Sequence, residues 1–236
     1  MGFAAYSGNG TNAKNKRTKE KTQQTQSKQL QTILTGVTMS KTILQIDASP
    51  RSDASLSRKV SQYISQQLAA KGDTIVHRDL ATSELPLLTE AHVEAFFTPP
   101  AQRNSEQNTL LTISDTLIDE LKQSTTLVIG APIYNFSVPA ALKAWIDLIC
   151  RTGETFRYTE NGPEGLLNIE KAYIAVSAGG VEVGSPVDFN SAYLKQVCHF
   201  IGIKEVHIID VSGSKRAPET LIDHAKAQVD RLMLSA

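Results

Sequence analysis

The chain has 236 residues, of which 41% are hydrophobic and 20% are charged, and this is ample apolar sequence for the core of one large domain. It has no apolar run near the ~20 residues that a membrane-spanning helix needs, so we expect no membrane partner. Lysine and arginine (24) balance aspartate and glutamate (24), which gives no electrostatic reason to expect a nucleic-acid partner.

The charge is distributed unevenly along the chain. Residues 1–38 hold six basic side chains and one acidic one, which leaves 18 basic and 23 acidic groups for the rest. The segment is polar, of low complexity and too poor in apolar residues to offset the cost of ordering. We predict a disordered or non-native extension over 1–38, Met39 as a natural start, and one folded domain over 39–236. A transit peptide is the alternative, although arginine and amphipathic apolar content are low.

The chain has two cysteines, Cys150 and Cys198, which lie in apolar contexts and form no CxxC motif. Such sparse cysteines are typical of a reducing compartment. We therefore predict a cytoplasmic protein without a disulfide between them.

From Met39 onward, strands and helices are predicted to alternate. Short runs rich in β-branched residues predict five strands, over 42–47, 74–79, 126–131, 172–177 and 206–211. Their nearly continuous apolar character is expected of parallel strands that are covered on both faces. A helix is predicted to begin near Pro139, and apolar residues at helical spacing predict four more. Their stripes are Leu56, Val60, Ile64 and Leu68; Leu110, Ile113, Leu117 and Leu121; Phe189, Tyr193, Val197 and Phe200; and Leu221, Ala225, Val229 and Leu232.

This alternation predicts an α/β fold, an open twisted sheet of five parallel strands with helices on both faces. Ligands of such sheets bind beyond the carboxyl ends of the strands, so the loops after the first, third and fourth strands are the candidates for function. The connection over 80–107 is long and carries three prolines. We interpret it as a partly helical cover or an oligomer contact.

The loop after the first predicted strand is rich in hydroxyl groups. It reads ASPRSDASLSR and contains Ser49, Ser52, Ser55 and Ser57. Serines and free backbone N–H groups at a helix N-terminus form a cradle for phosphate, whereas helix capping alone would account for one of them. The chain has no GxGxxG sequence in this loop and no GxxxxGK[ST] sequence anywhere, so Rossmann-type dinucleotide binding and P-loop hydrolysis are not expected.

Two further loops are candidates for contact with a planar ring. After the third predicted strand, Tyr134 and Phe136 lie between prolines and can form an apolar wall, or fall back onto the core. After the fourth strand, Gly179 and Gly180 allow a backbone to approach the polar edge of a heterocycle closely, or form a simple flexible turn.

Conventional catalytic groups are scarce in the sequence. The five histidines show no metal-binding spacing, and there is no GxSxG nucleophile motif. His77 and His207 fall within predicted strands and His199 on a helix, so we interpret them as structural or surface residues. No metal site is predicted.

Taken together, these loops resemble the FMN-dependent NADH-azoreductases, also described as NADH:quinone oxidoreductases, of the flavodoxin-like superfamily. The resemblance covers essentially Met39 to the C-terminus, and the string FRYTENGPEG (156–165), with the P-x-YNF turn upstream, makes it specific. It implies a flavodoxin-like fold and tightly bound FMN. The implied FMN-binding residues are Ser49, Ser55, Leu56 and Ser57 at the phosphate; Ile133, Tyr134, Asn135 and Phe136 beside the isoalloxazine; and Ser177, Ala178, Gly179 and Gly180 at its pyrimidine edge.

The resemblance also implies a homodimer with active sites at its interface, to which Tyr158 and Phe200 contribute substrate-pocket residues. Ala178 and Glu182 depart from the family, where arginine and histidine are frequent at these positions. The implied activity is reduction of quinones and aromatic azo compounds with NADH as electron donor. The three loops hold no histidine, cysteine or paired carboxylate, so we expect chemistry on the flavin without a catalytic side chain. Because one apolar face of the flavin would serve donor and acceptor in turn, we expect ping-pong exchange. The alternative is a flavodoxin-type electron carrier, against which the mild charge of the domain weighs.

Overall fold

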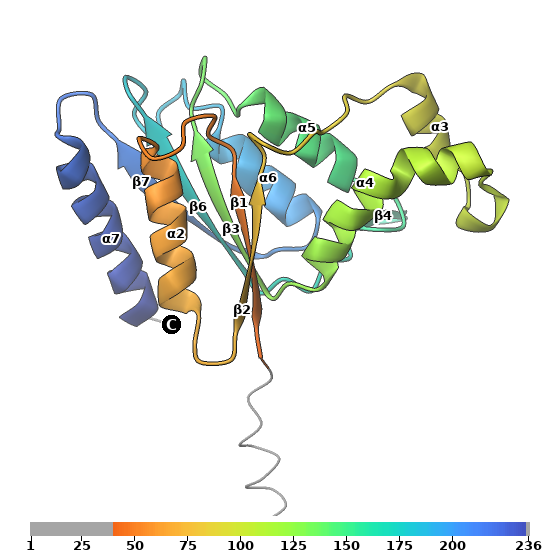
Figure 1. Ribbon diagram of the computed structural model, residues 1–236, viewed down its shortest axis with the longest axis horizontal. Helices are drawn as coiled ribbons and strands as arrows, with labels where there is room; N and C mark the ends of the chain where they lie inside the picture. The colour runs from red at the N-terminus through yellow and green to blue at the C-terminus, as the bar shows by residue number, and fades with distance from the viewer. Residues whose placement is uncertain (1–39, 235–236) are drawn as a thin grey trace, which may run out of the picture. The chain divides into compact units, whose positions relative to one another are not determined.

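The computed structural model describes residues 40–234, so the predicted extension over 1–38 lies outside the described residues. The residues from Lys41 onward form one compact unit. Its strands and helices are drawn in Figure 1 and have the following bounds: β1 Thr42–Asp47, α2 Leu56–Leu68, β2 Thr74–Asp79, α3 Glu90–Phe97, α4 Ser105–Lys122, β3 Thr126–Pro132, α5 Ala140–Ile149, β4 Phe156–Thr159, β5 Gly162–Gly165, β6 Lys171–Ala178, α6 Ser191–Phe200, β7 Glu205–Ser212 and α7 Pro218–Leu234.

The five predicted strands are confirmed as one parallel sheet in the order β2-β1-β3-β6-β7. The last three extend by one or two residues beyond the predicted bounds. From β1 the chain runs outward to β2, and β3 lies on the other side of β1, so the strand order switches between β1 and β3. The carboxyl ends of these strands therefore flank the position at which open α/β sheets bind ligands.

Helices cover both faces of the sheet (Figure 1). On one face, α2 and α7 pack side by side, with Val60, Ile64 and Ala225 in a core cluster that includes Ile43 of β1. On the other face, residues of α4, α5 and α6 form a second cluster around neighbouring strand positions such as Leu44. This separation follows from the alternation of side chains along a strand. It leaves Gln45 and Asp47 of β1 on the α2 side, where both are buried.

The predicted apolar stripe of α6 is wrong only at Phe189, because Tyr193, Val197 and Phe200 all pack against the core. Phe189 precedes α6 and is 59% exposed, and the buried face of α6 carries Leu194, Val197 and Cys198. The helix begins at Ser191 because the Asp188 carboxylate accepts the backbone N–H groups of Asn190 and Ser191 at 3.0 and 2.9 Å. Asn190 is the N-cap and makes no side-chain capping bond, so the Asp188 side chain supplies these bonds, which the apolar spacing alone did not indicate.

The antiparallel hairpin of β4 and β5 was not expected from the sequence. Gly165 of this hairpin lies directly against the turn after α6. A Cβ on Gly165 would come within 2.1 Å of the Gly202 nitrogen, so a side chain has no room there. The hairpin is therefore fastened to α6 by contact between two backbones. The 80–107 connection contains α3 and the short 3₁₀ helix Pro100–Gln102, so the prediction that it is partly helical is confirmed. Among residues 40–234, no helix combines the length and apolar character needed to span a membrane.

Candidate active site

Residues from the loops after β1, β3 and β6 converge on a cavity of about 400 Å³ at the carboxyl ends of the strands. The predicted binding residues that line it are Ser49, Ser55, Leu56, Ile133, Tyr134, Ser177, Ala178 and Gly179. Four predicted binding residues do not line this cavity: Ser57 in the first turn of α2, and Asn135, Phe136 and Gly180 in the loops. The topology therefore brings together segments that are separated by more than a hundred residues in the chain.

The loop after β1 ends in the N-terminus of α2. Ser55 is the N-cap, and its hydroxyl accepts the Arg58 backbone N–H at 3.4 Å, which is a long and therefore weak bond. Ser57 is fully buried and its hydroxyl lies 3.2 Å from that of Ser55. Ser55 thus performs the capping role and also forms part of the cavity wall, with Ser57 behind it.

Arg58 holds this loop in place from the side. Its guanidinium donates hydrogen bonds to the Ser49 carbonyl, at 2.6 and 3.1 Å, and to both carboxylate oxygens of Asp79, at 2.5 and 2.9 Å. The hydrogen bonds between Arg58 and Asp79 lower the pKa of Asp79 below its ordinary value and raise the pKa of Arg58. The ion pair between Arg58 and Asp79 of β2 therefore holds the backbone of the loop after β1 in place.

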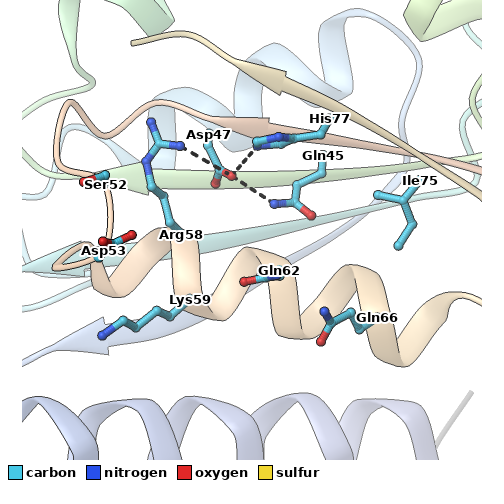
Figure 2. Close-up of a pocket in the computed structure, with 10 residues that line it drawn as sticks. All are labelled: Gln45, Asp47, Ser52, Asp53, Arg58, Lys59, Gln62, Gln66, Ile75 and His77. Atoms are coloured by element: carbon cyan, nitrogen blue, oxygen red, sulfur yellow. Dashed lines mark hydrogen bonds and ion pairs between the residues drawn. The ribbon is translucent and has the colours of Figure 1, made fainter. Parts of the chain in front are cut away.

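Asp47, at the end of β1, is a buried carboxylate beneath α2. It accepts hydrogen bonds from Gln45 at 2.9 Å and Ser61 at 2.6 Å, and its oxygen lies 2.8 Å from Nε2 of His77 (Figure 2). Gly130 of β3 makes room for it, since a Cβ there would lie 2.5 Å from the carboxylate. This cluster borders a separate polar cavity of about 540 Å³. His77 lies within β2, as predicted, and its observed bond is to a structural carboxylate.

The loop after β3 has a strained backbone. Asn135 and Phe136 have φ angles of 49° and 72°, which non-glycine residues rarely adopt. The Tyr134 and Ser137 backbones close this turn with two hydrogen bonds of 3.0 and 3.1 Å, and the Phe136 carbonyl accepts the Phe189 N–H at 3.0 Å. Strain that is held in this way is common at ligand sites. It leaves Phe136 55% exposed, so the alternative that it returns to the core is wrong.

The loop after β6 leaves open space beside its glycines. A Cβ on Gly179 or Gly180 would meet no atom within 4 Å, and neither residue has a positive φ. Neither packing within the chain nor backbone conformation therefore requires glycine there. Gly179 lines the cavity, so a ligand there could approach its backbone closely.

The loop after β7, which was not among the candidate loops, completes the cavity wall with Gly213 and Arg216. Arg51, from the loop after β1, is a second arginine in the lining. The sequence signal for the loop after β7 was its basic residues after a predicted parallel strand, but only the loops after the first, third and fourth strands were candidates.

Tyr158 and Phe200 lie apart from this cavity. Both rings pack on Phe156, with centroid distances of 5.4 Å for Tyr158 and 4.3 Å for Phe200. The hairpin holds Tyr158 in an exposed position, at 69% exposure. The structure thus describes an aromatic cluster at the hairpin and the end of α6.

Neither cysteine is poised as a nucleophile or metal ligand. Cys150 and Cys198 are both free thiols, and burial raises the pKa of each to about 12. Within residues 40–234, no group of three or more histidine, cysteine, aspartate or glutamate side chains is arranged to hold a metal.

The fold and this site agree with the comparisons with known proteins. The family model of proteins with a flavodoxin-like fold matches residues 41–233, which defines the class of the chain. FMN-dependent NADH:quinone oxidoreductase 1 of Hahella chejuensis is 48% identical over 189 residues, covering 79% of this chain and 92% of the relative. The protein of the same name from Jannaschia sp. is 46% identical over 190 residues, covering 80% and 97%. The chain belongs to the family of FMN-dependent NADH:quinone oxidoreductases.

Solved structures extend the comparison. An FMN-dependent NADH-azoreductase from Bacillus anthracis, crystallised in complex with FMN, superposes with a TM-score of 0.71 at 25% identity. The match covers 81% of this chain and 97% of that protein.

Proposed function

We propose that this chain is an enzyme that binds FMN tightly, takes electrons from NADH and reduces quinones and aromatic azo compounds. The observation that carries the proposal is the cavity in which the three predicted loops meet at the strand ends. The names of the relatives and of the azoreductase structure support the same cofactor, donor and acceptor classes.

The chemistry of the cavity fits FMN. At one end, the α2 N-terminus presents backbone N–H groups, the Ser55 hydroxyl and the Arg51 side chain, a donor set suited to a terminal phosphate. At the other end, Ile133 and Tyr134 offer apolar contact for a planar ring, and the open space beside Gly179 allows its polar edge to approach the backbone.

Bound FMN would supply the two-electron transfer between NADH and the acceptor, while the protein binds and orients the reactants. Tyr134 and Phe136 would form the wall against which nicotinamide and acceptor are held. The described residues that line the cavity include no histidine, cysteine or carboxylate. Protons would therefore be drawn from water, and side-chain replacements near the ring should alter substrate preference more than they abolish turnover.

Because one apolar wall would serve nicotinamide and acceptor alike, the two should bind in turn. Initial rates with NADH and a quinone should give the parallel double-reciprocal lines of ping-pong exchange. Intersecting lines, together with flavin that NADH reduces only after quinone is bound, would refute the shared wall.

A homodimer remains part of the proposal, with Tyr158 and Phe200 facing the substrate pocket across the interface. Such an interface would cover the side chains of Tyr158 and Phe136, which are 69% and 55% exposed. Light scattering on the purified protein tests the dimer. A cytoplasmic location is proposed from the two free cysteines.

The proposal is tested by identifying released flavin by HPLC and by measuring steady-state NADH oxidation with quinones and azo dyes. FMN should dominate, and turnover should be sustained. An FAD peak, or no flavin after incubation with FMN, would refute it, and FMN without turnover would favour the electron carrier. Deleting residues 1–38, proposed to be an extension, should leave flavin content and activity unchanged.

A further inference from the structure

Arg216 lies in the loop between β7 and α7 and forms part of the same cavity wall as Ser49 and Ser55. Its position follows from the packing of the two helices on this face of the sheet. Because α7 lies beside α2 (Figure 1), the loop that leads into α7 comes next to the loop that leads into α2. A basic residue from the far end of the chain is thus brought to the predicted phosphate loop.

The guanidinium of Arg216 has no ion pair or hydrogen bond with any residue in the described part of the chain. Arg58, in the first turn of α2, is in contrast engaged by Asp79 and Ser49. The stem of Arg216 passes Gly213, since a Cβ on that glycine would lie 3.7 Å from the arginine Cδ. That distance is an ordinary contact, and Gly213 is suited to the turn by its φ of 142° and by the Leu221 side chain, which would lie 3.1 Å from a Cβ.

The charge of the cavity is one-sided. Arg51 and Arg216 are its charged lining residues, and no carboxylate of the described residues lines it. A phosphate monoester carries about −1.5 to −2 charges at neutral pH, and an arginine binds phosphate through charge-assisted hydrogen bonds. The cavity therefore offers an anion two cations and the N–H groups of α2.

We propose that Arg216 binds the phosphate of FMN and makes the site select FMN over riboflavin, which has the same ring without the phosphate. This inference rests on the proposed function, and it assigns a role to the loop after β7, which lies outside the three predicted loops.

The test is a comparison of two ligands on the flavin-free full chain. Dissociation constants for FMN and for riboflavin are measured by quenching of flavin fluorescence, for the parent, Arg216→Gln and Arg216→Lys. Arg216→Gln should weaken FMN binding on the order of tenfold and leave riboflavin binding within about twofold, since the removed contact is to phosphate alone. Arg216→Lys keeps the charge and should recover part of the loss. The FMN effect should shrink in 0.5 M salt, as expected for an exposed charge.

Lys215→Gln is the matched control. Lys215 adjoins Arg216 and carries the same charge. Both residues line a neighbouring cavity that also contains Glu182 and Asp210, but of the two only Arg216 lines the flavin cavity. Lys215→Gln should therefore leave FMN binding nearly unchanged.

Three results would overturn the role of Arg216 alone: an unchanged FMN constant in Arg216→Gln, equal losses for FMN and riboflavin, or an equal FMN loss in Lys215→Gln. A parent protein that binds no FMN would instead overturn the proposed function, and the inference with it.

Discussion

The ion pair between Arg58 and Asp79 fixes the loop that carries Ser49, and replacing Asp79 by asparagine tests its contribution. The substitution removes the negative charge but keeps an oxygen that can accept the Ala81 backbone N–H, which Asp79 accepts at 2.9 Å. A hydrogen bond to a charged group contributes ~1.5–3 kcal/mol. The side chains are 14% and 26% exposed, so screening by solvent reduces this figure. We expect Asp79→Asn to lower the free energy of unfolding by about 1–2 kcal/mol at pH 7.

The pH dependence of this loss has a defined sign. Hydrogen bonding to Arg58 lowers the pKa of folded Asp79, so the unfolded chain takes up the proton first as the pH falls. The stabilisation is complete above the unfolded pKa, which is about 3.9, and it is lost as the pH falls through the folded value. The difference between parent and Asp79→Asn should therefore be smaller at pH 3 than at pH 7.

Urea unfolding of the flavin-free proteins at both pH values measures this difference. Asp147→Asn is the control, because it breaks an exposed i,i+4 pair with Lys143 that is worth at most about 0.5 kcal/mol. A gap for Asp79→Asn that is equal at pH 7 and pH 3, or no larger than that of the control at pH 7, would refute the reasoning.

Three further substitutions test other parts of the structure. Ser55→Ala should weaken FMN binding about tenfold in a fluorescence titration, and cost under about 1 kcal/mol in urea unfolding; unchanged FMN binding would leave Ser55 with capping alone. Phe136→Gly should keep the unfolding free energy of the flavin-free protein within about 1 kcal/mol, because glycine relieves the positive φ, while changing kcat/KM for quinones; a loss above 3 kcal/mol would show that Phe136 is a packing residue. Asp115→Ala should cost about 2 kcal/mol in urea unfolding, because it leaves buried Arg151 without its carboxylate; a loss below 0.5 kcal/mol would show that Arg151 is satisfied without Asp115.

The central strands β1, β3 and β6 were predictable because burial on both faces gives a continuous apolar run in the sequence, whereas the edge strand β2 is exposed or half-buried along its length. The β4–β5 hairpin has no such signal. Its second strand reads Gly-Pro-Glu-Gly, which disfavours a strand locally, and it forms against the turn after α6 through the contact of Gly165 with Gly202. A backbone contact across about forty residues cannot be read from periodicity.

The candidate site shows the same division. Ser55 and Tyr134 lie in the loops that follow β1 and β3, so the rule that ligands bind at strand ends predicted that they lie near each other. To place Arg216 in the cavity wall, one would have to know that α7 packs beside α2. To predict that Arg58 holds Ser49, one would have to know where Asp79 lies on β2. These are consequences of helix packing and register, which local sequence does not encode.

The strand order also bears on how copies of this chain can associate. β2 and β7 are the edge strands, each paired with one neighbour in the described sheet. Charged groups flank both edges: Arg78 is paired with Glu120 beside β2, and Lys171 with Glu205 at the start of β7. Such charges discourage the addition of a foreign strand and so protect a sheet against edge-to-edge aggregation. We therefore expect copies of this domain to associate through helices and loops. The sheet of one molecule should not pair edge to edge with the sheet of another.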